Sequence, residues 1–149
     1  MSAQPEPKPR VGFEGVNPIL RVSDVKASIA YYTGVLGFEV DWNNAIFAAV
    51  SRDKCHLFLS EGDQGHTGGW VWIGVEDVDA LLAEYQVSGA KIRHAPTNYT
   101  WAREMQVEDP DGNILRMGSE TRDSEPVGEW LDMDGVTWVP TADGGWQKK

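Results

Sequence analysis

The strongest constraint on the fold is a short pattern that occurs twice, about fifty residues apart. The stretch Val22–Val25 (VSDV) returns as Val75–Val78 (VEDV), 53 positions later. The stretch Gly37–Val40 (GFEV) returns as Gly89–Ile92 (GAKI), 52 positions later. In each copy an Asp stands where a helix can be capped, and a Gly follows where that helix can end. The repeat therefore predicts two copies of one structural unit in tandem.

The first unit is predicted to contain a strand, a helix and three more strands. Gly15–Val22 has the composition of a strand, with Pro18 near its start. One helical stripe then follows, formed by Val25, Ile29, Tyr32 and Leu36. Short apolar runs separated by polar turns predict the remaining strands, which are Phe38–Trp42, Ile46–Val50 and Lys54–Ser60.

The second unit repeats this order after a polar, glycine-rich link, Glu61–Gly69. It begins with a strand at Trp70–Val75 and continues with a helical stripe of Val78, Leu81, Leu82 and Tyr85. The turn Asp109–Gly112 carries Pro and Gly at positions that suit a type I turn leading into a strand. The other predicted strands are Lys91–His94, Arg103–Glu108 and Asn113–Met117.

These elements predict an α+β fold in which residues 13–120 form two tandem βαβββ modules. One helix in each module covers only one face of four strands, so the other face must curl around a cleft or pack on a partner. We therefore expect a curled mixed sheet whose concave face carries the function.

The two ends of the chain lie outside the repeat. Residues 1–12 contain Pro5, Pro7 and Pro9 and are predicted to be disordered. Residues 121–149 form an extension in which Asp134-Gly135 predicts a β-hairpin with a type I′ turn. This hairpin carries apolar surface for docking on the body, namely Trp130, Trp138 and Trp146.

The charge of the chain restricts its partners. Acidic residues outnumber basic ones by 23 to 13, which gives a net charge of -10. This sign disfavours nucleic acid and favours a cationic small molecule. The single Cys55 excludes an internal disulfide and fits a reducing compartment. Because no apolar run is long enough to span a membrane and no signal-peptide pattern opens the chain, we expect a cytoplasmic protein without a membrane partner.

Several stretches resemble one known family. Phe47–Asp53, Trp70–Trp72 and Thr100–Glu104, followed by the hairpin at Asp109–Gly112, are similar to motifs of the bleomycin-resistance (drug-binding) proteins, within the glyoxalase or vicinal-oxygen-chelate superfamily. The resemblance covers about residues 13–118. It departs from the family pattern in the aromatic loop, where Thr100 and Ala102 replace Pro and Gly, and in the added C-terminal extension.

The resemblance also implies where metal-binding members of the superfamily hold their ion. Those positions correspond to Asn17, Trp70 and Arg116, with a fourth at or next to His56. An indole offers no lone pair to a metal, a guanidinium is cationic, and a neutral amide is a poor ligand by itself. We therefore expect no metal, no cofactor and no catalytic residue, with His56 a hydrogen-bonded wall residue.

The ligand site implied by the resemblance is aromatic. Phe47 and Trp101 correspond to the pair of rings that stacks on the drug, and Trp70 to a residue of the cleft wall. The remaining contacts implied by the match are Asp41, Trp42, Ser60 and Gly112. Arg103 and Arg116 are expected to pair with acids of the nearby hairpin, such as Glu104, rather than with a ligand.

The function implied by the resemblance is binding without chemistry. The protein is expected to sequester a bleomycin-like or other planar, cationic natural product in aromatic clefts at a homodimer interface, and so to confer antibiotic resistance. In this family the two protomers exchange their first strand at a proline that corresponds to Pro18. Three alternatives stay open: a metal-dependent lyase, isomerase or dioxygenase of the same fold, a metal-free enzyme with His56 as base, and a purely structural role.

Overall fold

The first module has the predicted order of elements. A computed structural model describes residues 9–149 of the chain. A four-stranded sheet in the order β1-β4-β3-β2 carries one helix, and only the pairing of β1 with β4 is parallel. The elements are β1 (Ile19–Arg21), α1 (Val25–Gly34), β2 (Glu39–Asn43), β3 (Phe47–Arg52) and β4 (Cys55–Ser60).

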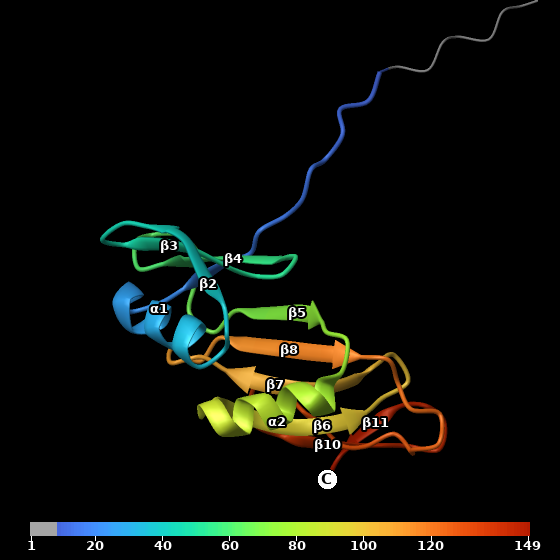
Figure 1. The fold of residues 1–149 in the computed structure, drawn as a ribbon. Helices are drawn as coiled ribbons and strands as arrows, with labels where there is room; N and C mark the ends of the chain where they lie inside the picture. Colours follow the sequence, from blue (N-terminus) through green and yellow to red (C-terminus); the bar gives the residue numbers. More distant parts are fainter. Residues whose placement is uncertain (1–8) are drawn as a thin grey trace, which may run out of the picture.

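The second module repeats this topology. Its sheet has the order β5-β8-β7-β6, in which only β5 and β8 pair in parallel. The two sheets lie one above the other in Figure 1. The elements are β5 (Trp70–Gly74), α2 (Val78–Ser88), β6 (Lys91–Asn98), β7 (Arg103–Glu108) and β8 (Ile114–Ser119). The prediction of two tandem βαβββ modules is thus confirmed.

Both helices begin where the repeat predicts. Asp24 caps α1 by accepting from the backbone N–H of Ala27 at 3.2 Å, and Asp77 caps α2 by accepting from Asp79 and Ala80 at 3.1 Å each. Each bond satisfies a backbone donor that the first helical turn leaves free. Gly89 ends α2 with a φ of 86°, a conformation that Gly adopts without strain.

The two modules share one core and are also linked by hydrogen bonds. The Tyr32 hydroxyl donates to the carboxylate of Asp109 at 3.0 Å, and that of Tyr85 donates to the carbonyl of Leu36 at 2.9 Å. Arg52 forms a two-point ion pair with Glu84, which links β3 to α2. The buried apolar residues at the centre include Val22, Tyr32, Leu36, Val50, Leu59, Val78, Tyr85, Met105, Val107 and Leu115. The helix stripes predicted from the sequence therefore face this core.

Two strands differ from the prediction by more than two residues at one end, whereas the other predicted strands of the two modules agree to within two residues. The first strand covers only Ile19–Arg21 instead of Gly15–Val22, because its register with β4 begins at Ile19. Just before it, the carbonyl of Pro18 accepts the backbone N–H of Phe58 at 2.9 Å, but proline has no N–H to donate in return. The strand predicted at Lys91–His94 continues to Asn98, passing Pro96 through two register shifts relative to β7. Such irregularities accommodate a proline, which cannot donate a ladder hydrogen bond. Of the N-terminal segment predicted to be disordered, residues 1–8 lie outside the described residues, and residues 9–12 are exposed and form neither helix nor strand.

The C-terminal extension contains the predicted hairpin and one more strand. β9 (Trp130–Leu131), β10 (Thr137–Pro140) and β11 (Trp146–Lys148) form an antiparallel sheet in the order β11-β10-β9. The predicted type I′ turn is wrong: Gly135 has a φ of 80°, but Asp134 before it has no positive φ. The carboxylate of Asp132 instead accepts the backbone N–H groups of Asp134 and Val136, so a side chain stabilises this turn.

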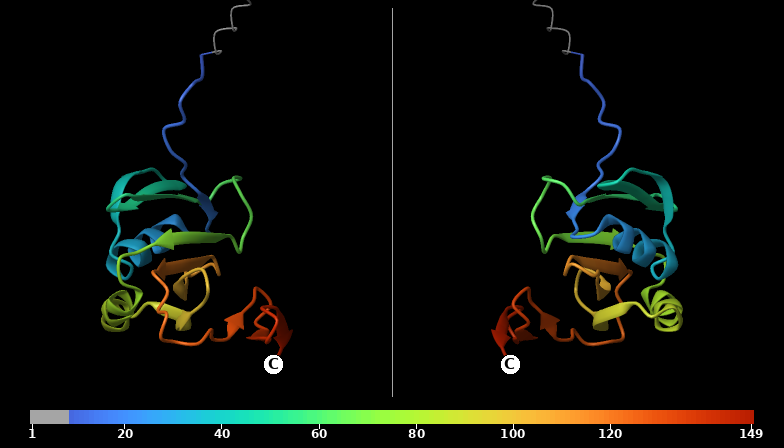
Figure 2. Two further views of the ribbon diagram at one scale, coloured as in Figure 1. Left: turned by 90° about the vertical axis from the view of Figure 1, so that its right-hand side faces the viewer. Right: turned by 90° about the vertical axis from the view of Figure 1, so that its left-hand side faces the viewer.

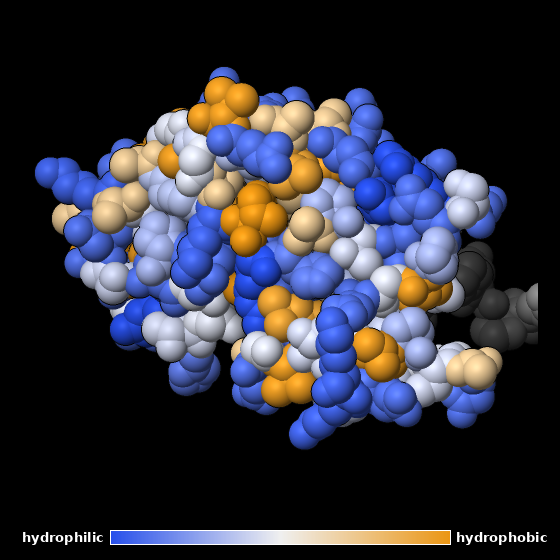
Figure 3. Space-filling model, turned by 90° about the horizontal axis from the view of Figure 1, so that it is seen from below, coloured by the Kyte–Doolittle hydropathy of each residue, from blue (hydrophilic) through white to orange (hydrophobic). Residues whose placement is uncertain are grey.

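The extension lies across the second sheet from α2, as both panels of Figure 2 show. The face of the molecule seen from below is mainly hydrophilic, with hydrophobic residues in small separate patches (Figure 3). Among residues 9–149, no helix has the length and apolar composition needed to cross a membrane.

Candidate functional site

The candidate site lies on the sheet faces that point away from the helices. In the second module, Trp72 is the register partner of Arg116, which in turn is the partner of Gln106. Paired residues share a face, so these side chains lie opposite the core residues Met105 and Leu115. The sequence predicts that the sheet face away from the helix carries the function, and Trp72, Arg116 and Gln106 lie on that face.

A buried carboxylate organises the second-module face. Glu104 is only 1% exposed. Its Oε2 accepts the indole N–H of Trp72 at 2.9 Å and that of Trp101 at 2.6 Å, while Arg116 donates Nε to Oε1 at 2.9 Å and Nη2 to Oε2 at 3.0 Å. Four charge-assisted hydrogen bonds on one carboxylate fix the position of two indoles and one guanidinium. Because Trp72 and Trp101 are each 50% exposed, both rings are oriented but accessible.

Trp101 belongs to a larger cluster of rings. It stacks on Tyr99 with a centroid distance of 4.8 Å and an interplanar angle of 3°. From the extension, Trp130 meets Tyr99 and Trp101 nearly edge-on at 5.7 and 6.2 Å, and Trp146 lies 6.3 and 6.5 Å from the same rings. Tyr99 is buried, and its burial raises the pKa of the phenol to about 12, so it stays neutral near pH 7. The rings of Tyr99, Trp130 and Trp146 thus pack around that of Trp101 and restrict its movement.

The first module carries a second aromatic group. Trp42 stacks on Phe47 at 5.4 Å and 16°, and Phe47 also meets Phe58 at 5.4 Å. Ser60 is the register partner of Phe47 and is buried. Trp42 is 51% exposed, so this face too offers an accessible ring.

Two of the polar residues predicted for the first module, Asp41 and His56, lie side by side. The Nδ1 of His56 is 3.6 Å from Oδ2 of Asp41, and the Ser51 hydroxyl donates to Oδ1 of Asp41 at 2.8 Å. These groups are exposed, so their mutual attraction contributes little to stability. The carboxylate of Asp41 nevertheless places a negative charge beside the rings of the first module.

Within one chain the predicted site residues fall into separate groups. Every ring neighbour of Phe47 belongs to the first module, whereas those of Trp101 belong to the second module and the extension. Gly112 lies in the turn at the opposite end of β7 from Trp101, about 20 Å away at the usual rise of a strand. Phe47 and Trp101 therefore belong to separate groups of rings within a single protomer.

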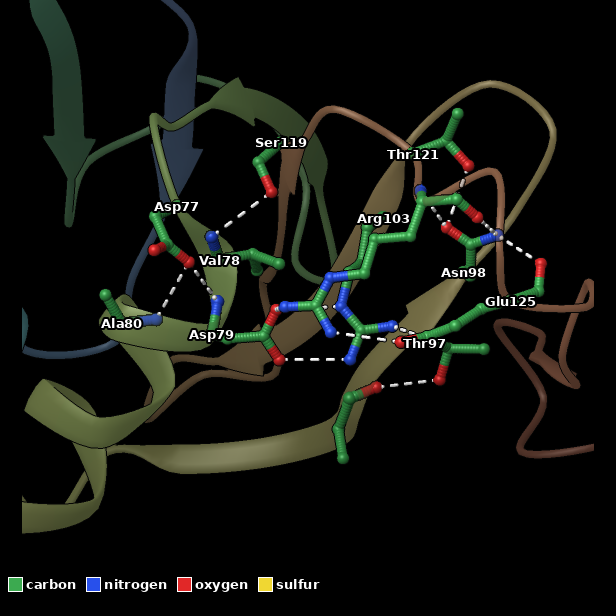
Figure 4. Close-up of polar contacts among 12 residues, drawn as sticks. Asp77, Val78, Asp79, Ala80, Thr97, Asn98, Arg103, Ser119, Thr121 and Glu125 are labelled. Carbon is green, nitrogen blue, oxygen red and sulfur yellow. Dashed lines mark hydrogen bonds and ion pairs between the residues drawn. The ribbon is translucent and has the colours of Figure 1, made fainter.

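Arg103 connects the second module to the start of the extension rather than to a ligand. It donates Nε and Nη2 to the carboxylate of Asp79 at 2.8 and 3.0 Å and Nη1 to Glu125 at 2.8 Å (Figure 4). Arg122 pairs with the same two acids. The hydrogen bond from Arg103 is the main cause that lowers the pKa of Asp79. Asn98 completes this anchor by bonding the backbone of Arg122 and Glu125.

Two cavities of about 500 Å³ lie elsewhere in the protein. One of ≈ 500 Å³ surrounds the Arg103 ion pairs, and one of ≈ 520 Å³ lies between the modules beside Arg52 and Glu84. Neither is lined by a residue that the sequence predicts for the site. The arginines of both cavities already bond carboxylates, so we place the candidate site on the aromatic faces.

Residues 15–117 match the family model described as the Glyoxalase/Bleomycin resistance protein/Dioxygenase superfamily. The chain belongs to this superfamily. No curated protein sequence matches the chain.

Solved structures of other proteins share this fold. The bleomycin-binding protein of Streptomyces verticillus, crystallised with copper(II)-bleomycin, is 29% identical, with a TM-score of 0.64 over 76% of this chain and 100% of that chain. TnmS3, an antibiotic-binding protein from Streptomyces sp. CB03234, is 22% identical, with a TM-score of 0.65 over 75% and 100% of the two chains. A glyoxalase/bleomycin resistance protein/dioxygenase from Nocardioides is 18% identical, with a TM-score of 0.60 over 78% and 90%.

Three of the four positions that the sequence resemblance assigns to metal ligands carry unsuitable donors in this chain, and only the fourth, His56, could coordinate. Trp70 and Arg116 lie on the second-module face, where Arg116 is already paired with Glu104, and Asn17 lies in the exposed segment before β1. Among residues 9–149, no group of three or more His, Cys, Asp or Glu side chains is placed to hold a metal. The residues at these positions therefore do not fit a divalent ion.

Sequence reasoning missed four members of the second-module cluster as site residues. They are Tyr99, Glu104, Trp130 and Trp146. Glu104 was expected only as a partner for an arginine, which it is for Arg116. In the extension, the sequence repeats a tryptophan every eight residues, at Trp130, Trp138 and Trp146. This spacing indicates a repeated strand and turn, but it does not indicate which of the three rings contacts the second module. The separation of Arg103 from Asp79 and Glu125 in the sequence hid its actual partners.

Proposed function

We propose that this protein binds a planar small molecule by stacking it on aromatic side chains and leaves the molecule chemically unchanged. The observation that carries the proposal is the pair of half-exposed indoles, Trp72 and Trp101, held by one buried carboxylate. Rings that are fixed before binding lose little conformational entropy when a guest arrives. Stacking on such a ring contributes roughly 1–3 kcal/mol per ring.

The proposed ligand is a cationic natural product, with bleomycin and its relatives as the first candidates. The net charge of -10 attracts a cation, and Asp41 lies beside the first-module rings. The likeness to a protein crystallised with copper(II)-bleomycin supports this choice of first ligand. In this proposal the half-exposed rings of Trp42, Trp72 and Trp101, together with Phe47, contact the ligand. The other residues predicted for the site lie at its edges, namely Asp41, His56, Ser60, Trp70 and Gly112. The biological role would be antibiotic resistance by sequestration in the cytoplasm.

The proposed site forms between two copies of the chain. Val11, Phe13 and Val16 are 90%, 101% and 88% exposed in the segment before β1, an unusual exposure for apolar side chains spaced so closely. We propose that this arm crosses to a second copy at Pro18. The first-module face of one protomer then lies opposite the second-module face of the other, which brings Phe47 and the partner's Trp101 to either side of one ligand.

Fluorescence titration of the purified protein with metal-free bleomycin, followed by a panel of planar antibiotics, tests the proposal. We expect saturable quenching of Trp emission and recovery of the ligand unaltered. No quenching by any member of the panel would reject the binding function. For the dimer, light scattering is expected to give twice the chain mass, and Phe13→Asp is expected to shift the protein toward monomer.

The superfamily also contains enzymes, so a metal-dependent lyase, isomerase or dioxygenase is the competing function. Metal analysis separates the two proposals without knowledge of a substrate. A stoichiometric, tightly held divalent ion would favour the enzyme, whereas Asn17, Trp70 and Arg116 favour the binding protein because they are poor ligands.

A further inference from the structure

The C-terminal extension covers the part of the second-module face where two superfamily metal positions lie. The indole of Trp130 has the guanidinium of Arg116 over its ring, with Cζ 5.0 Å from the centroid. Its centroid is 6.3 Å from that of Trp70 and 5.7 Å from that of Tyr99. An aromatic ring, a guanidinium and a further ring thus surround one indole. These are the groups that would hold a flat guest.

The backbone of the extension is fixed to the same face by hydrogen bonds. The Tyr99 hydroxyl donates to the carbonyl of Glu129 at 2.6 Å, and Gln106 Nε2 donates to the carbonyl of Leu131 at 3.0 Å. Arg93 also donates to the carbonyl of Leu131 at 3.4 Å, and its guanidinium lies 5.7 Å from the ring centroid of Trp70. Gln106 is buried, and its amide N–H₂ would lose this hydrogen bond if the extension moved away.

The extension reaches this face through a close approach at Gly128. The backbone N–H of Gly128 donates to the carbonyl of Asn98 at 2.9 Å, and a Cβ at Gly128 would lie 2.3 Å from Cγ2 of Thr97. Only Gly fits here without displacing a neighbour. The path of the chain into β9 is therefore closely fitted to β6.

Trp138 provides an internal comparison. It stands opposite Trp130 in the β9–β10 ladder, but its indole N–H donates to Asp132 at 2.7 Å and its ring meets Lys148 at 5.8 Å. Both partners belong to the extension itself. Trp138 is thus a tryptophan of the same small sheet whose observed ring and hydrogen-bond partners lie outside the second module.

We propose that Trp130 is a built-in occupant of a ring-binding position on the second module, and that the extension thereby sets which ligands the protein accepts. The proposal rests on the proposed function for its biological meaning. With the position beside Trp70 and Arg116 filled, a ligand is confined to the open edge formed by Trp72 and Trp101. The extension therefore restricts this protein to ligands whose contacts with the second module are limited to the open edge at Trp72 and Trp101.

The experiment removes the occupant and offers a substitute. Free indole is titrated against the full-length wild type, Trp130→Gly and Trp138→Gly, with binding followed by calorimetry and by the shift in Tm. Only Trp130→Gly is expected to bind indole saturably and to gain thermal stability from it, because only this variant vacates a site lined by rings and a guanidinium. An equal response of all three proteins, or none from a folded Trp130→Gly, would overturn the proposal.

A second variant covers loss of folding. If Trp130→Gly is unfolded at the assay temperature, Trp130→Leu retains apolar volume and leaves a smaller space, for which benzene is the probe. A saturable rise in Tm with benzene, absent from wild type and Trp138→Leu, supports the proposal, and no difference among the three contradicts it.

The bleomycin titration distinguishes this inference from the proposed function. If Trp130→Gly binds indole but the wild type binds no ligand of the panel, the proposal that Trp130 occupies a ring-binding position is supported and the proposed binding function is rejected. If the wild type binds bleomycin but a folded Trp130→Gly does not bind indole, the binding function is supported and the proposal for Trp130 is rejected.

Discussion

The carboxylate of Glu104 and the guanidinium of Arg116 form a two-point ion pair, with Nε–Oε1 and Nη2–Oε2 distances of 2.9 and 3.0 Å. The sequence resemblance predicts that metal-binding relatives have a carboxylate ligand at the position of Arg116. At this position the chain therefore has a permanent cation in place of a metal ligand, and Glu104 neutralises its charge. The same carboxylate orients Trp72 and Trp101, so the site's aromatic surface depends on it.

Glu104→Gln should therefore destabilise the protein and weaken ligand binding together. The amide oxygen can take the place of Oε2, which accepts from both indoles, but the amide N–H₂ then faces Nε of Arg116 in place of Oε1. Arg116 therefore loses one acceptor and the negative charge that neutralises it, and the hydrogen bonds from the two indoles lose their charge assistance. We expect a loss of about 2 kcal/mol in the free energy of unfolding, measured by urea denaturation. The control is Glu108→Gln, which removes an ion pair with the largely exposed Lys91 and should cost less than about 1 kcal/mol. Equal costs for the two variants would show that the Glu104 cluster has no special role.

Gly128→Ala should loosen the extension without disturbing the body. Its Cβ would overlap with Cγ2 of Thr97, so either Thr97 or the chain leading into β9 must shift, and we expect the chain to move because β6 holds Thr97 in the second module. We expect faster cleavage of the extension in limited proteolysis, with the fragment masses read by mass spectrometry.

The second change that tests this contact is Thr97→Ser, which deletes Cγ2 and keeps the hydroxyl that donates to Ala95. The double variant is expected to recover most of the protease resistance. If it is cleaved as fast as Gly128→Ala, the contact with Thr97 is not the cause.

The ion pairs around Arg103 should make stability depend on acid pH. The hydrogen bond from Arg103 lowers the pKa of Asp79 below its ordinary value of 3.8. A group with a lowered folded pKa stabilises the protein above its unfolded pKa, and this contribution is lost as the pH falls through the folded pKa. Asp79→Asn should thus cost up to about 1 kcal/mol at pH 7 and almost nothing near pH 2. Urea denaturation at both pH values is the measurement, and a cost that does not shrink in acid would contradict this assignment.

The repeat in the sequence accounts for most of the fold. The capping acids Asp24 and Asp77 and the apolar stripes behind them are local signals, and they fixed both helices and the order of the strands correctly. The first strand is shorter than predicted because its pairing with β4 begins only at Ile19, and Pro18 before it offers β4 a carbonyl but no N–H. Strand pairing is a long-range property that local pattern does not report.

The candidate site was only partly predictable for the same reason. Alternation along a strand puts Trp72 on the same face as Trp70, which the resemblance assigns to the cleft wall. Nearness in the hairpin suggested Glu104 as a partner for Arg116, and the two form an ion pair. By contrast, the contacts of Trp130 with Tyr99 and Arg116 join segments that pattern alone cannot bring together. The turn at Asp134-Gly135 was misassigned because the side chain of Asp132, two residues earlier, decides its geometry.

Trp101 should carry a large share of ligand affinity. Its ring is half-exposed, supported by Tyr99 and oriented by Glu104. We expect Trp101→Ala to weaken binding of a planar ligand by more than about 1 kcal/mol, the usual scale for an aromatic anchor. Trp138→Ala is the matched control, because its indole bonds within the extension.

The most direct measurement is a calorimetric titration of the wild type, Trp101→Ala and Trp138→Ala with metal-free bleomycin and the antibiotic panel, followed by mass spectrometry of the recovered ligand. A planar cationic ligand should bind wild type and Trp138→Ala alike, bind Trp101→Ala at least fivefold more weakly, and be recovered with its mass unchanged. Conversion of the ligand, or equal affinity in all three proteins, would contradict binding by stacking without chemistry.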